Sequence, residues 1–402
     1  MISYILRGKL KTSKTSSELL QQSALCRDPA MNSKEKMLTA MTVGLGGDLP
    51  VVIPYVDIFL RDHWEKTTDQ PWWTFNSPDL SAWLKVEEDL LRRVDMDWIE
   101  CGMCPPKDWR ARHMVEANEG SVFLVDIHSM KKEELRRPPI GGTHIPVGRE
   151  PLVQSVDDVD KYVDVVDKQA LIRSGRLDHA KMVAERYGSH RFLCAIMGTP
   201  YWRALCHYFG FKGMMTNLLR RPRLVEHLLE RLMASAGEEL NAYADVGVDG
   251  IWLEESLSSA NEISLDKFRE FVLPYDKELI SEIRRLGMKS IYYPCGNVAD
   301  RLELAIQANP DCISLEEGKK GFEIDIARVD EIVAGRACLF GNLDAVGILQ
   351  DGTQGEMRKE VLRQIDIGSR HGRFVMSLGS PVTPRTPVSR VREYIDLVRQ
   401  ES

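Results

Sequence analysis

The chain has 402 residues, of which 43% are hydrophobic and 28% charged, and its formal net charge at pH 7 is −7. This composition is that of an ordinary globular protein, and the mildly acidic balance gives no electrostatic reason to expect nucleic acid as a partner. The length allows one large core or two ordinary ones, so it does not by itself decide the number of domains.

Eight cysteines are scattered through the chain, and its N-terminus does not show the basic, apolar and small-residue regions of a secretory leader. This pattern favours free thiols in a reducing compartment, so we expect a cytoplasmic protein. No apolar run reaches the roughly 18–20 residues that are needed to cross a bilayer. We therefore expect no membrane anchor.

Residues 1–30 are rich in Ser, Thr, Lys and Gln and show no sustained apolar period. They are predicted to form an N-terminal extension outside the core. A clearer pattern begins at Met31. Residues 32–41 combine a candidate N-cap, Ser33, with apolar Met37, Leu38 and Met41, which indicates a first helix.

Between residues 31 and 402, short apolar runs alternate with amphipathic segments, as expected of parallel strands joined by helices. Eight runs are predicted to be strands: residues 50–55, 97–101, 192–197, 250–253, 290–293, 312–315, 337–340 and 374–378. Helical periodicity marks residues 223–243, 266–286 and 299–308. The pattern predicts a single TIM-type (β/α)8 barrel domain. An open doubly wound sheet is the weaker alternative, because no Gly-x-Gly-x-x-Gly follows the first strand.

A long insertion separates the second and third predicted strands, at about residues 104–185. Within it, residues 121–127 resemble one arm of a hairpin, and a Pro- and Gly-rich stretch leads to His144. Long loops in compact domains are usually functional, so we expect a lid or substrate-binding excursion over the catalytic face. Trp72 and Trp73, after the first strand, are expected to add to this cover.

Polar residues gather where the predicted strands end, which in an α/β barrel is the face that carries the active site. They are Tyr55, Asp57, Cys101, Glu254, Glu255, Tyr293, Cys295, Glu316, Asn342, Asp344 and Ser380, with Met197 at the third strand. Carboxylates in such places act as general acids or bases, substrate anchors or metal ligands. The alternative for Glu254 and Glu255 is that one of them caps the following helix.

Residues 290–297 read as a buried strand that runs into a tight turn and a helix, with Cys295 at the turn. A thiol at that position is a candidate for chemistry, with a small buried hydrophobe as the alternative. Cys101 and Cys104 have redox or zinc spacing, but no second pair completes four ligands, so ordinary thiols are favoured. Motifs of serine hydrolases, helical metal sites and phosphate-binding loops are absent from the sequence.

Several segments taken together resemble one known family. They are Gly247-Val248-Asp249-Gly250 before Glu254-Glu255, Phe268 to Tyr275, Pro294-Cys295-Gly296-Asn297, Gly341-Asn342-Leu343-Asp344, and Leu378-Gly379-Ser380-Pro381. This set is similar to the uroporphyrinogen decarboxylase superfamily, which contains decarboxylases and cobamide-dependent methyltransferases. The resemblance covers residues 247–402 well, and residues 32–50 and 198–223 more loosely. It implies a TIM-type barrel with its site at the strand ends.

The resemblance also separates the two branches of that family. The decarboxylases grip their substrate with an arginine-rich motif near the first strand, whereas residues 50–57 contain no arginine, and they carry a histidine where this chain has Ser380. The methyltransferases bind zinc through His-x-Cys and a second cysteine, at positions that match Tyr293, Cys295 and Ser380. The chain is closer to the methyltransferases, yet only Cys295, together with Glu255, is left as a candidate metal ligand. A zinc ion therefore stays an open question.

The first hypothesis is an enzyme that moves a methyl group between a small methylated compound, such as a methoxylated aromatic or a methylamine-type molecule, and a corrinoid carried by a partner protein. Its predicted catalytic residues are Glu255, Tyr293, Asn342 and Ser380. Its predicted substrate-binding residues are Tyr55, Asp57, Trp72, Trp73, His144, Met197 and Glu316. The alternatives are a lyase or decarboxylase acting on a non-porphyrin substrate, and a non-catalytic barrel that binds a corrinoid or small molecule. A homo-oligomer is compatible with each.

Overall fold

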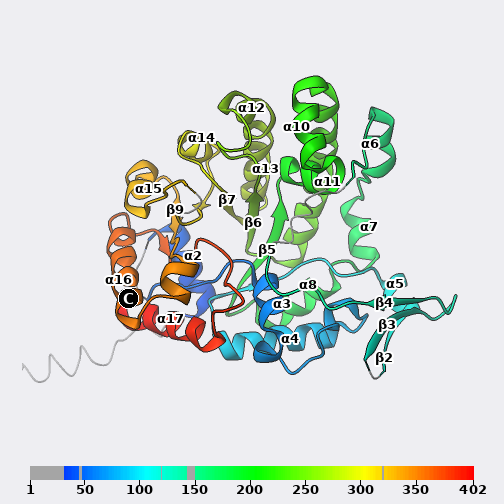
Figure 1. Cartoon of the computed structure of the whole chain (residues 1–402), viewed down its shortest axis with the longest axis horizontal. Helices are drawn as coiled ribbons and strands as arrows, with labels where there is room; N and C mark the ends of the chain where they lie inside the picture. Colours follow the sequence, from blue (N-terminus) through cyan, green and yellow to red (C-terminus); the bar gives the residue numbers. More distant parts are fainter. Residues whose placement is uncertain (1–30, 45–47, 119, 143–149, 319–320) are drawn as a thin grey trace, which may run out of the picture.

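The computed structural model describes residues 31–402, apart from residues 45–47, 119, 143–149 and 319–320 (Figure 1). Residues 1–30 and His144, for which the sequence makes predictions, lie outside the described residues. A curled sheet of seven parallel strands forms the centre, in the order β1-β5-β6-β7-β8-β9-β10. Its strands are β1 (Trp98–Glu100), β5 (Phe192–Gly198), β6 (Gly250–Glu255), β7 (Lys289–Pro294), β8 (Cys312–Ile313), β9 (Cys338–Phe340) and β10 (Phe374–Val375).

The predicted first strand, residues 50–55, fills the remaining position of the barrel without becoming a regular strand. Val51 forms a single parallel bridge with Met376, and the backbone carbonyl of Val51 accepts a hydrogen bond from the Asp97 amide at 2.9 Å. This short segment lies between β10 and the start of β1 and closes the barrel. Pro54 offers no amide to a neighbouring strand, and Tyr55 turns the chain into a helix with a φ of 56°. The predicted TIM-type barrel is confirmed, with a shorter first strand than expected.

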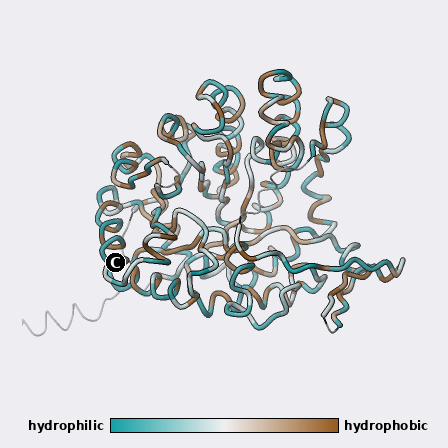
Figure 2. The backbone as a smooth tube through the Cα atoms, in the orientation of Figure 1, coloured by the Kyte–Doolittle hydropathy of each residue, from teal (hydrophilic) through white to brown (hydrophobic). Residues whose placement is uncertain are grey.

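Helices surround the sheet, and along them hydrophobic and hydrophilic stretches alternate, as expected of amphipathic helices that cover a core (Figure 2). They are α2 (Ser33–Thr42), α3 (Val56–Thr67), α4 (Leu80–Val94), α8 (Asp178–Tyr187), α9 (Pro200–Arg203), α10 (Gly210–Arg220), α11 (Pro222–Val246), α12 (Leu265–Phe271), α13 (Leu273–Arg285), α14 (Leu302–Gln307), α15 (Ile326–Val333), α16 (Gln354–Ser369) and α17 (Val388–Glu401). The barrel also has one short 3-10 helix, η1 (Thr74–Asn76), and two π-helical segments, η2 (Ala204–Phe209) and η3 (Ala345–Gln350). None of the helices in the described part of the chain combines the length and apolarity that a membrane span requires.

Two helix predictions need correction. The first helix is capped by Asn32 rather than Ser33. The Asn32 side chain accepts a hydrogen bond from the Glu35 backbone amide, and the Glu35 carboxylate accepts one from the Asn32 backbone amide. The helix predicted at residues 266–286 is two helices, α12 and α13, which meet at Val272. Pro274 has no amide hydrogen to continue the helical ladder, so the chain restarts there.

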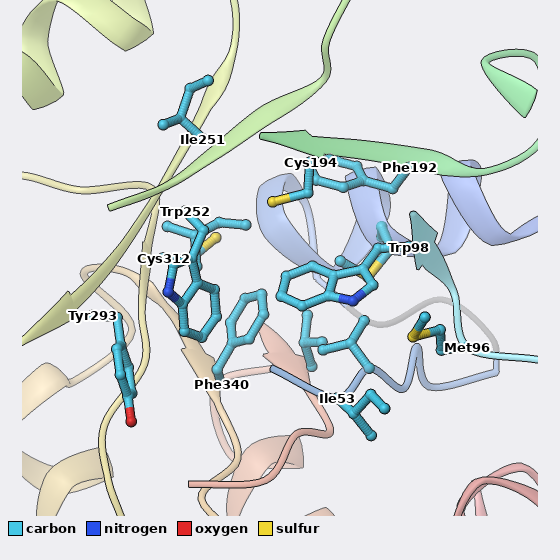
Figure 3. Packing of buried hydrophobic residues seen from close by; sticks show 14 of the residues in the cluster. Ile53, Met96, Trp98, Phe192, Cys194, Ile251, Trp252, Tyr293, Cys312 and Phe340 are labelled. Carbon is cyan, nitrogen blue, oxygen red and sulfur yellow. The ribbon is translucent and has the colours of Figure 1, made fainter. Parts of the chain in front are cut away.

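Large aromatic rings fill the barrel interior. Trp252 of β6 packs edge-on against Trp98 of β1 with ring centroids 5.5 Å apart, and both lie beside Phe340 of β9 (Figure 3). Tyr293 of β7 continues the stack with its centroid 4.8 Å from that of Trp252. These rings close the centre of the barrel, so any site must lie above them at the strand ends.

The insertion after β1 contains an antiparallel sheet of β2 (His113–Asn118), β3 (Ser121–Asp126) and β4 (Lys132–Leu135), which protrudes from the barrel (Figure 1). The expected hairpin arm is β3. The helices α5 (Lys107–Arg112), α6 (Val156–Tyr162) and α7 (Lys168–Arg173) belong to the same insertion. Gly141 and Gly142, which follow β4 in the chain, contact Asp62 and Arg61 of α3.

Candidate active site at the strand ends

A cavity of about 390 Å³ lies at the carboxyl ends of the strands. Its walls come from the end of β6, from the segments that follow β6, β7, β8, β9 and β10, from the first half of α3, and from Gly141 and Gly142 of the insertion. The polar side chains that line it are Tyr55, Asp62, Glu254, Ser256, Glu262, Cys295, Glu316, Ser380 and Thr383. Five of the strand-end residues that the sequence analysis selects, Tyr55, Glu254, Cys295, Glu316 and Ser380, are thus brought together.

Two lining residues have backbone conformations that are rare for side chains of their size. Tyr55 has a φ of 56° and Leu257 a φ of 64°, both in the left-handed region. Such conformations cost free energy and persist where the surrounding structure requires them, frequently at functional sites. In this chain they turn Tyr55 into the cavity from the start of α3 and turn the chain out of β6 after Ser256.

The Cys295 thiol is the centre of a compact hydrogen-bonded group. The Ser256 Oγ lies 3.0 Å from the Cys295 Sγ and 2.9 Å from the Glu254 Oε1. The Tyr55 Oη lies 3.7 Å from the same sulfur and 3.4 Å from the same carboxylate oxygen. Burial raises the pKa of the Cys295 thiol, and the negative charges of Glu254 and Glu316 raise it further. The group therefore holds its sulfur as a neutral thiol.

Glu254 and Glu255, adjacent at the end of β6, point in opposite directions because side chains alternate along a strand. Glu254 lines the cavity. Glu255 is fully buried outside it, where its carboxylate accepts a hydrogen bond from the Thr199 hydroxyl. Burial raises the pKa of Glu255, with a further contribution from Asp276. The structure does not bring Glu255, a predicted catalytic residue and metal ligand, to the cavity, and neither glutamate caps a helix.

Asp276 of α13 completes a buried acidic cluster behind β6 and β7. Its carboxylate accepts a hydrogen bond from the Tyr292 hydroxyl at 2.5 Å, and burial raises its pKa to about 7. One oxygen each of Glu255 and Asp276 is buried without a hydrogen-bond partner among the described residues. Both carboxyls are therefore held in an environment that favours their protonated forms.

Tyr293 and Asn342, both predicted to be catalytic, lie beside the cavity rather than in its wall. The Tyr293 hydroxyl donates to the Gly379 carbonyl at 2.7 Å, and its ring packs on Trp252 below the cavity (Figure 3). The Asn342 amide donates to the carbonyls of Glu316 and Ile324, both at 3.2 Å. These bonds hold the backbone at the ends of β8 and β10 in place. Because both side chains point toward these backbone carbonyls, neither the Tyr293 hydroxyl nor the Asn342 amide reaches the cavity.

Ser380 and Glu316 do line the cavity, and each is bound to its surroundings. The Ser380 hydroxyl donates to Glu317 at 2.6 Å. Glu316 accepts from the Gly296 amide at 3.0 Å. Gly296 has a φ of 84°, and a Cβ there would lie 2.8 Å from the Ser259 side chain, so this turn requires glycine. The turn places Cys295 between Glu254 and Glu316.

The other predicted substrate-binding residues lie elsewhere. Met197 is buried in the core. Trp72 and Trp73 pack edge-on against each other with centroids 5.7 Å apart, outside the lining of the cavity. Asp57 lines a second, smaller cavity of about 130 Å³ between α3, α4 and β1, together with Glu87 and Glu100.

Sequence reasoning missed Ser256, Asp62, Glu262 and the glycines of the insertion. The signal for Ser256 was present, because residues 252, 254 and 256 follow the two-residue period of the strand that ends there. The Gly141 amide donates to Asp62 at 3.0 Å, and Arg61 donates to the Gly142 carbonyl at 3.1 Å. These are contacts between segments far apart in the chain, for which the sequence carried no signal.

The residues present do not fit the zinc site that the family resemblance implies. Tyr293 and Ser380 stand where that site uses His and Cys, and their hydroxyls donate to Gly379 and Glu317. Glu255 faces away from Cys295, and neutral hydroxyls are poor zinc ligands. Within the residues that the structure describes, no three His, Cys, Asp or Glu side chains converge in a way that could hold a metal ion. The Cys-x-x-Cys pair, Cys101 and Cys104, consists of buried free thiols.

Comparisons with known proteins agree with this architecture. The model of the uroporphyrinogen decarboxylase (URO-D) family matches residues 136–401. The methylcobamide:CoM methyltransferase MtbA of Methanosarcina acetivorans is 22% identical over 274 residues, which are 67% of this chain and 74% of that protein. The uroporphyrinogen decarboxylase of Chlorobaculum tepidum is 25% identical over 266 residues, 63% of this chain and 71% of that protein.

A solved structure described as a methyltransferase from Methanosarcina mazei superposes with a TM-score of 0.67. The superposition covers 92% of this chain and 99% of the other, at 18% sequence identity. At 18% identity, this superposition shows that the two proteins share a fold.

Proposed function

Because the chain belongs to the uroporphyrinogen decarboxylase family, whose members include both methyltransferases and decarboxylases, we propose that it is a methyltransferase. It moves a methyl group between a small methylated compound and a corrinoid carried on a separate protein, in the cytoplasm. Methoxylated aromatics and methylamine-type molecules are the substrate classes that we propose. The single observation that carries the proposal is the cavity at the strand ends, in which a thiol, a carboxylate and two hydroxyls converge.

The differences between the two branches of the family support methyl transfer. A porphyrinogen decarboxylase must hold a substrate with several carboxylates, which calls for cationic side chains. The cavity is instead lined by Asp62, Glu254, Glu262 and Glu316, and no Lys, Arg or His is found among its described lining residues. Sequence relatives on the methyltransferase side include MtbA proteins from two Methanosarcina species.

The corrinoid supplies the cobalt that takes up or gives up the methyl group. The residues of this chain bind and orient the methylated compound and manage the proton of its leaving group. A methyl ether or amine leaves poorly unless it is protonated or bound to a Lewis acid. Tyr55, Ser256 and Cys295 carry the hydroxyl and thiol protons at the cavity wall, so they are the groups that we propose for this task.

We further propose that the insertion covers the cavity as a lid. Gly141 and Gly142 form part of the cavity wall and are held by Asp62 and Arg61 of α3. Arg61 also pairs with Asp62 at 2.8 Å, which fixes the carboxylate that receives the Gly141 amide. This arrangement ties the far end of the insertion to the catalytic face.

The test is a methyl-transfer assay with the purified full-length protein, a reduced corrinoid protein, and a panel of methyl ethers and methylamines. Formation of methylated cobalt is followed by its absorption spectrum. We expect methylation with at least one donor. Failure of every donor to methylate the cobalt, together with no binding between this chain and the corrinoid protein, would overturn the proposal. Carbon dioxide release from a non-porphyrin carboxylate under the same conditions would favour the lyase alternative.

A further inference from the structure

The second cavity, between α3, α4 and β1, has a volume of about 130 Å³ and no part in the proposed methyl transfer. Seven of its ten lining residues are apolar, and the other three are the carboxylates Asp57, Glu87 and Glu100. Lys, Arg and His are absent from its described lining. Its volume is close to the roughly 150 Å³ of an engineered protein cavity that holds benzene. The cavity therefore has room for a small organic molecule.

Glu87 of α4 lines this cavity with one oxygen unsatisfied. The residue is 9% exposed, and its Oε2 has no hydrogen-bond partner among the described residues. Its Oε1 lies 3.4 Å from the Nε2 of His179 on α8. Burial lowers the pKa of His179 to about 4, so that ring is uncharged and brings no positive charge to the carboxylate. A buried polar atom without a partner costs free energy, which a ligand that donates a hydrogen bond would recover.

Glu100, at the end of β1, adds a second carboxyl group to the same cavity. Its Oε1 accepts a hydrogen bond from the Val56 amide at 3.4 Å. Burial raises the pKa of both Glu87 and Glu100. The negative charge of Glu100 raises the pKa of Glu87 further, and that of Asp57 raises the pKa of Glu100. A positive charge placed among these groups would stabilise the ionised form of each.

The walls of the cavity select the kind of cation. Within the described residues, no three carboxylates converge as the ligands of a metal ion do. Glu87 and Glu100 instead stand in a cavity whose other walls are apolar, and the ring of Phe75 forms part of them. Such walls suit a ligand that has an ammonium group at one end and a short hydrocarbon chain at the other, because an aromatic face also attracts a cation.

We propose that this cavity is a second binding site, which takes a small primary alkylammonium ion. The ammonium group donates hydrogen bonds to the carboxylates of Glu87 and Glu100, and the alkyl chain packs against Leu60 and Leu90. Buried charged groups are often replaceable by apolar residues without loss of stability. The need for a cationic ligand gives these two carboxylates a purpose that folding does not.

The exposure of the carboxylates shows where the ligand enters. Asp57 is exposed, Glu100 is partly exposed and Glu87 is buried, so negative charge leads from the surface to the inner end of the cavity. The opening lies where β1 ends and α3 begins. Tyr55, which precedes α3, lines the candidate active site, so the first turn of α3 separates the two cavities.

The first experiment compares two ligands that differ in charge alone. Propylammonium chloride and propan-1-ol, which have nearly the same shape, are titrated into the purified full-length protein at constant ionic strength, and binding is followed by ligand-observed NMR. We expect propylammonium to bind at least about tenfold more tightly than propan-1-ol. Equal affinities, or no binding of either molecule, would overturn the proposal and leave water as the occupant.

Variants of the two carboxylates test the location. Glu87→Gln and Glu100→Gln should each weaken the binding of propylammonium by at least about fivefold. Glu88→Gln is the matched control, because it removes the same charge from the next residue of α4, whose carboxylate is partly exposed and pairs with Lys85. It should change the affinity by less than about twofold. Circular dichroism confirms that the variants fold. An equal loss in Glu88→Gln would mean that the ion responds only to surface charge, and would overturn the site.

The candidate active site also carries carboxylates, so Glu262→Gln serves to separate the two cavities. Propylammonium binding should persist in Glu262→Gln. Binding that is lost in Glu262→Gln but kept in Glu87→Gln would place the ion in the active site and overturn the second site. Charge-dependent binding that requires Glu87, in a protein that methylates no cobalt, would retain this site and reject the proposed function.

Discussion

Carboxylates lie on both sides of β6 and β7, but their surroundings differ. On the inner face, Glu254 and Cys295 reach a cavity and exchange hydrogen bonds with Ser256. Behind the outer face, Glu255 of β6 and Asp276 of α13 are buried between the sheet and the helix, and Thr199 and Tyr292 donate hydrogen bonds to them. The carboxylate of Glu254 is accessible from the cavity, whereas those of Glu255 and Asp276 are buried. The difference shows that strand alternation, rather than residue type, decides which of the two glutamates faces the cavity.

The largest expected effect comes from the thiol on the inner face. Cys295→Ala should lower methyl transfer by about 10²–10³-fold, as expected for loss of a proton donor, while changing the free energy of unfolding by no more than about 1 kcal/mol. Cys312→Ala, in the barrel core, is the matched control: it should cost about 1–2 kcal/mol of stability with little loss of rate. Single-turnover rates and urea unfolding measure the two quantities. A reversed pattern would mean that Cys295 only packs the wall.

The adjacent carboxylates offer the most direct contrast between the two faces. Glu254→Gln should lower methyl transfer about 10²-fold. Glu255→Gln keeps the Thr199 contact within reach and should change the rate by less than about threefold. Steady-state assays measure the methyl-transfer rates of both variants, and circular dichroism confirms that both are folded. A greater loss of rate in Glu255→Gln than in Glu254→Gln would mean that Glu255 is the catalytic carboxylate.

The buried carboxyl of Asp276 should make the free energy of unfolding depend on pH. Burial raises the folded pKa of Asp276 to about 7, above its value in the unfolded chain, so the native state binds more protons between these two values. Stability should therefore fall as pH rises through that window and level off above about pH 7. Asp276→Asn should remove this slope. As pH rises from about 4 to about 8, the free energy of unfolding of the variant should therefore increase relative to that of the parent by on the order of 2–4 kcal/mol.

Urea unfolding across that pH range is the measurement for Asp276. Asp366→Asn, whose carboxylate lies exposed on α16, serves as control and should retain the parent slope. An unchanged slope in Asp276→Asn would mean that this carboxyl is already ionised in the folded protein.

The smallest expected effect concerns the proposed lid over the cavity. Arg61→Ala removes the bond to the Gly142 carbonyl and the partner of Asp62. We expect KM to rise by about threefold to tenfold, which corresponds to roughly 1 kcal/mol of binding, with kcat little changed. Arg269→Ala, on the exposed side of α12, is the control. A fall in kcat alone would place the effect in the chemical step instead of in substrate retention.

The fold followed from local patterns that the sequence carries in full. Apolar runs at residues 192–197, 250–253 and 290–293 became β5, β6 and β7, because a buried parallel strand must be apolar on both faces. The first run became a bridge because Pro54 and the turn at Tyr55 end it early. The family was equally readable, since its motifs are contiguous segments.

The sequence predicted only part of the site, because some side-chain orientations depend on contacts between strands. Sequence patterns identified Tyr55, Glu254, Cys295, Glu316 and Ser380, because a barrel brings together the residues at the ends of its strands. The choice between Glu254 and Glu255 needed the register of β6 against its neighbours, and Tyr293 and Asn342 were turned inward by carbonyls from other strands.

The sequence by itself determined that this chain is a barrel of the URO-D family with a thiol at the end of its β7 strand, because strand patterns and motifs are local. Tertiary structure alone decided which neighbours that thiol has. The contacts of Cys295 with Ser256 and Tyr55, and of Gly141 with Asp62, join residues that lie 39, 240 and 79 positions apart. Contacts over such separations depend on the packing of the whole chain, which a local pattern does not encode.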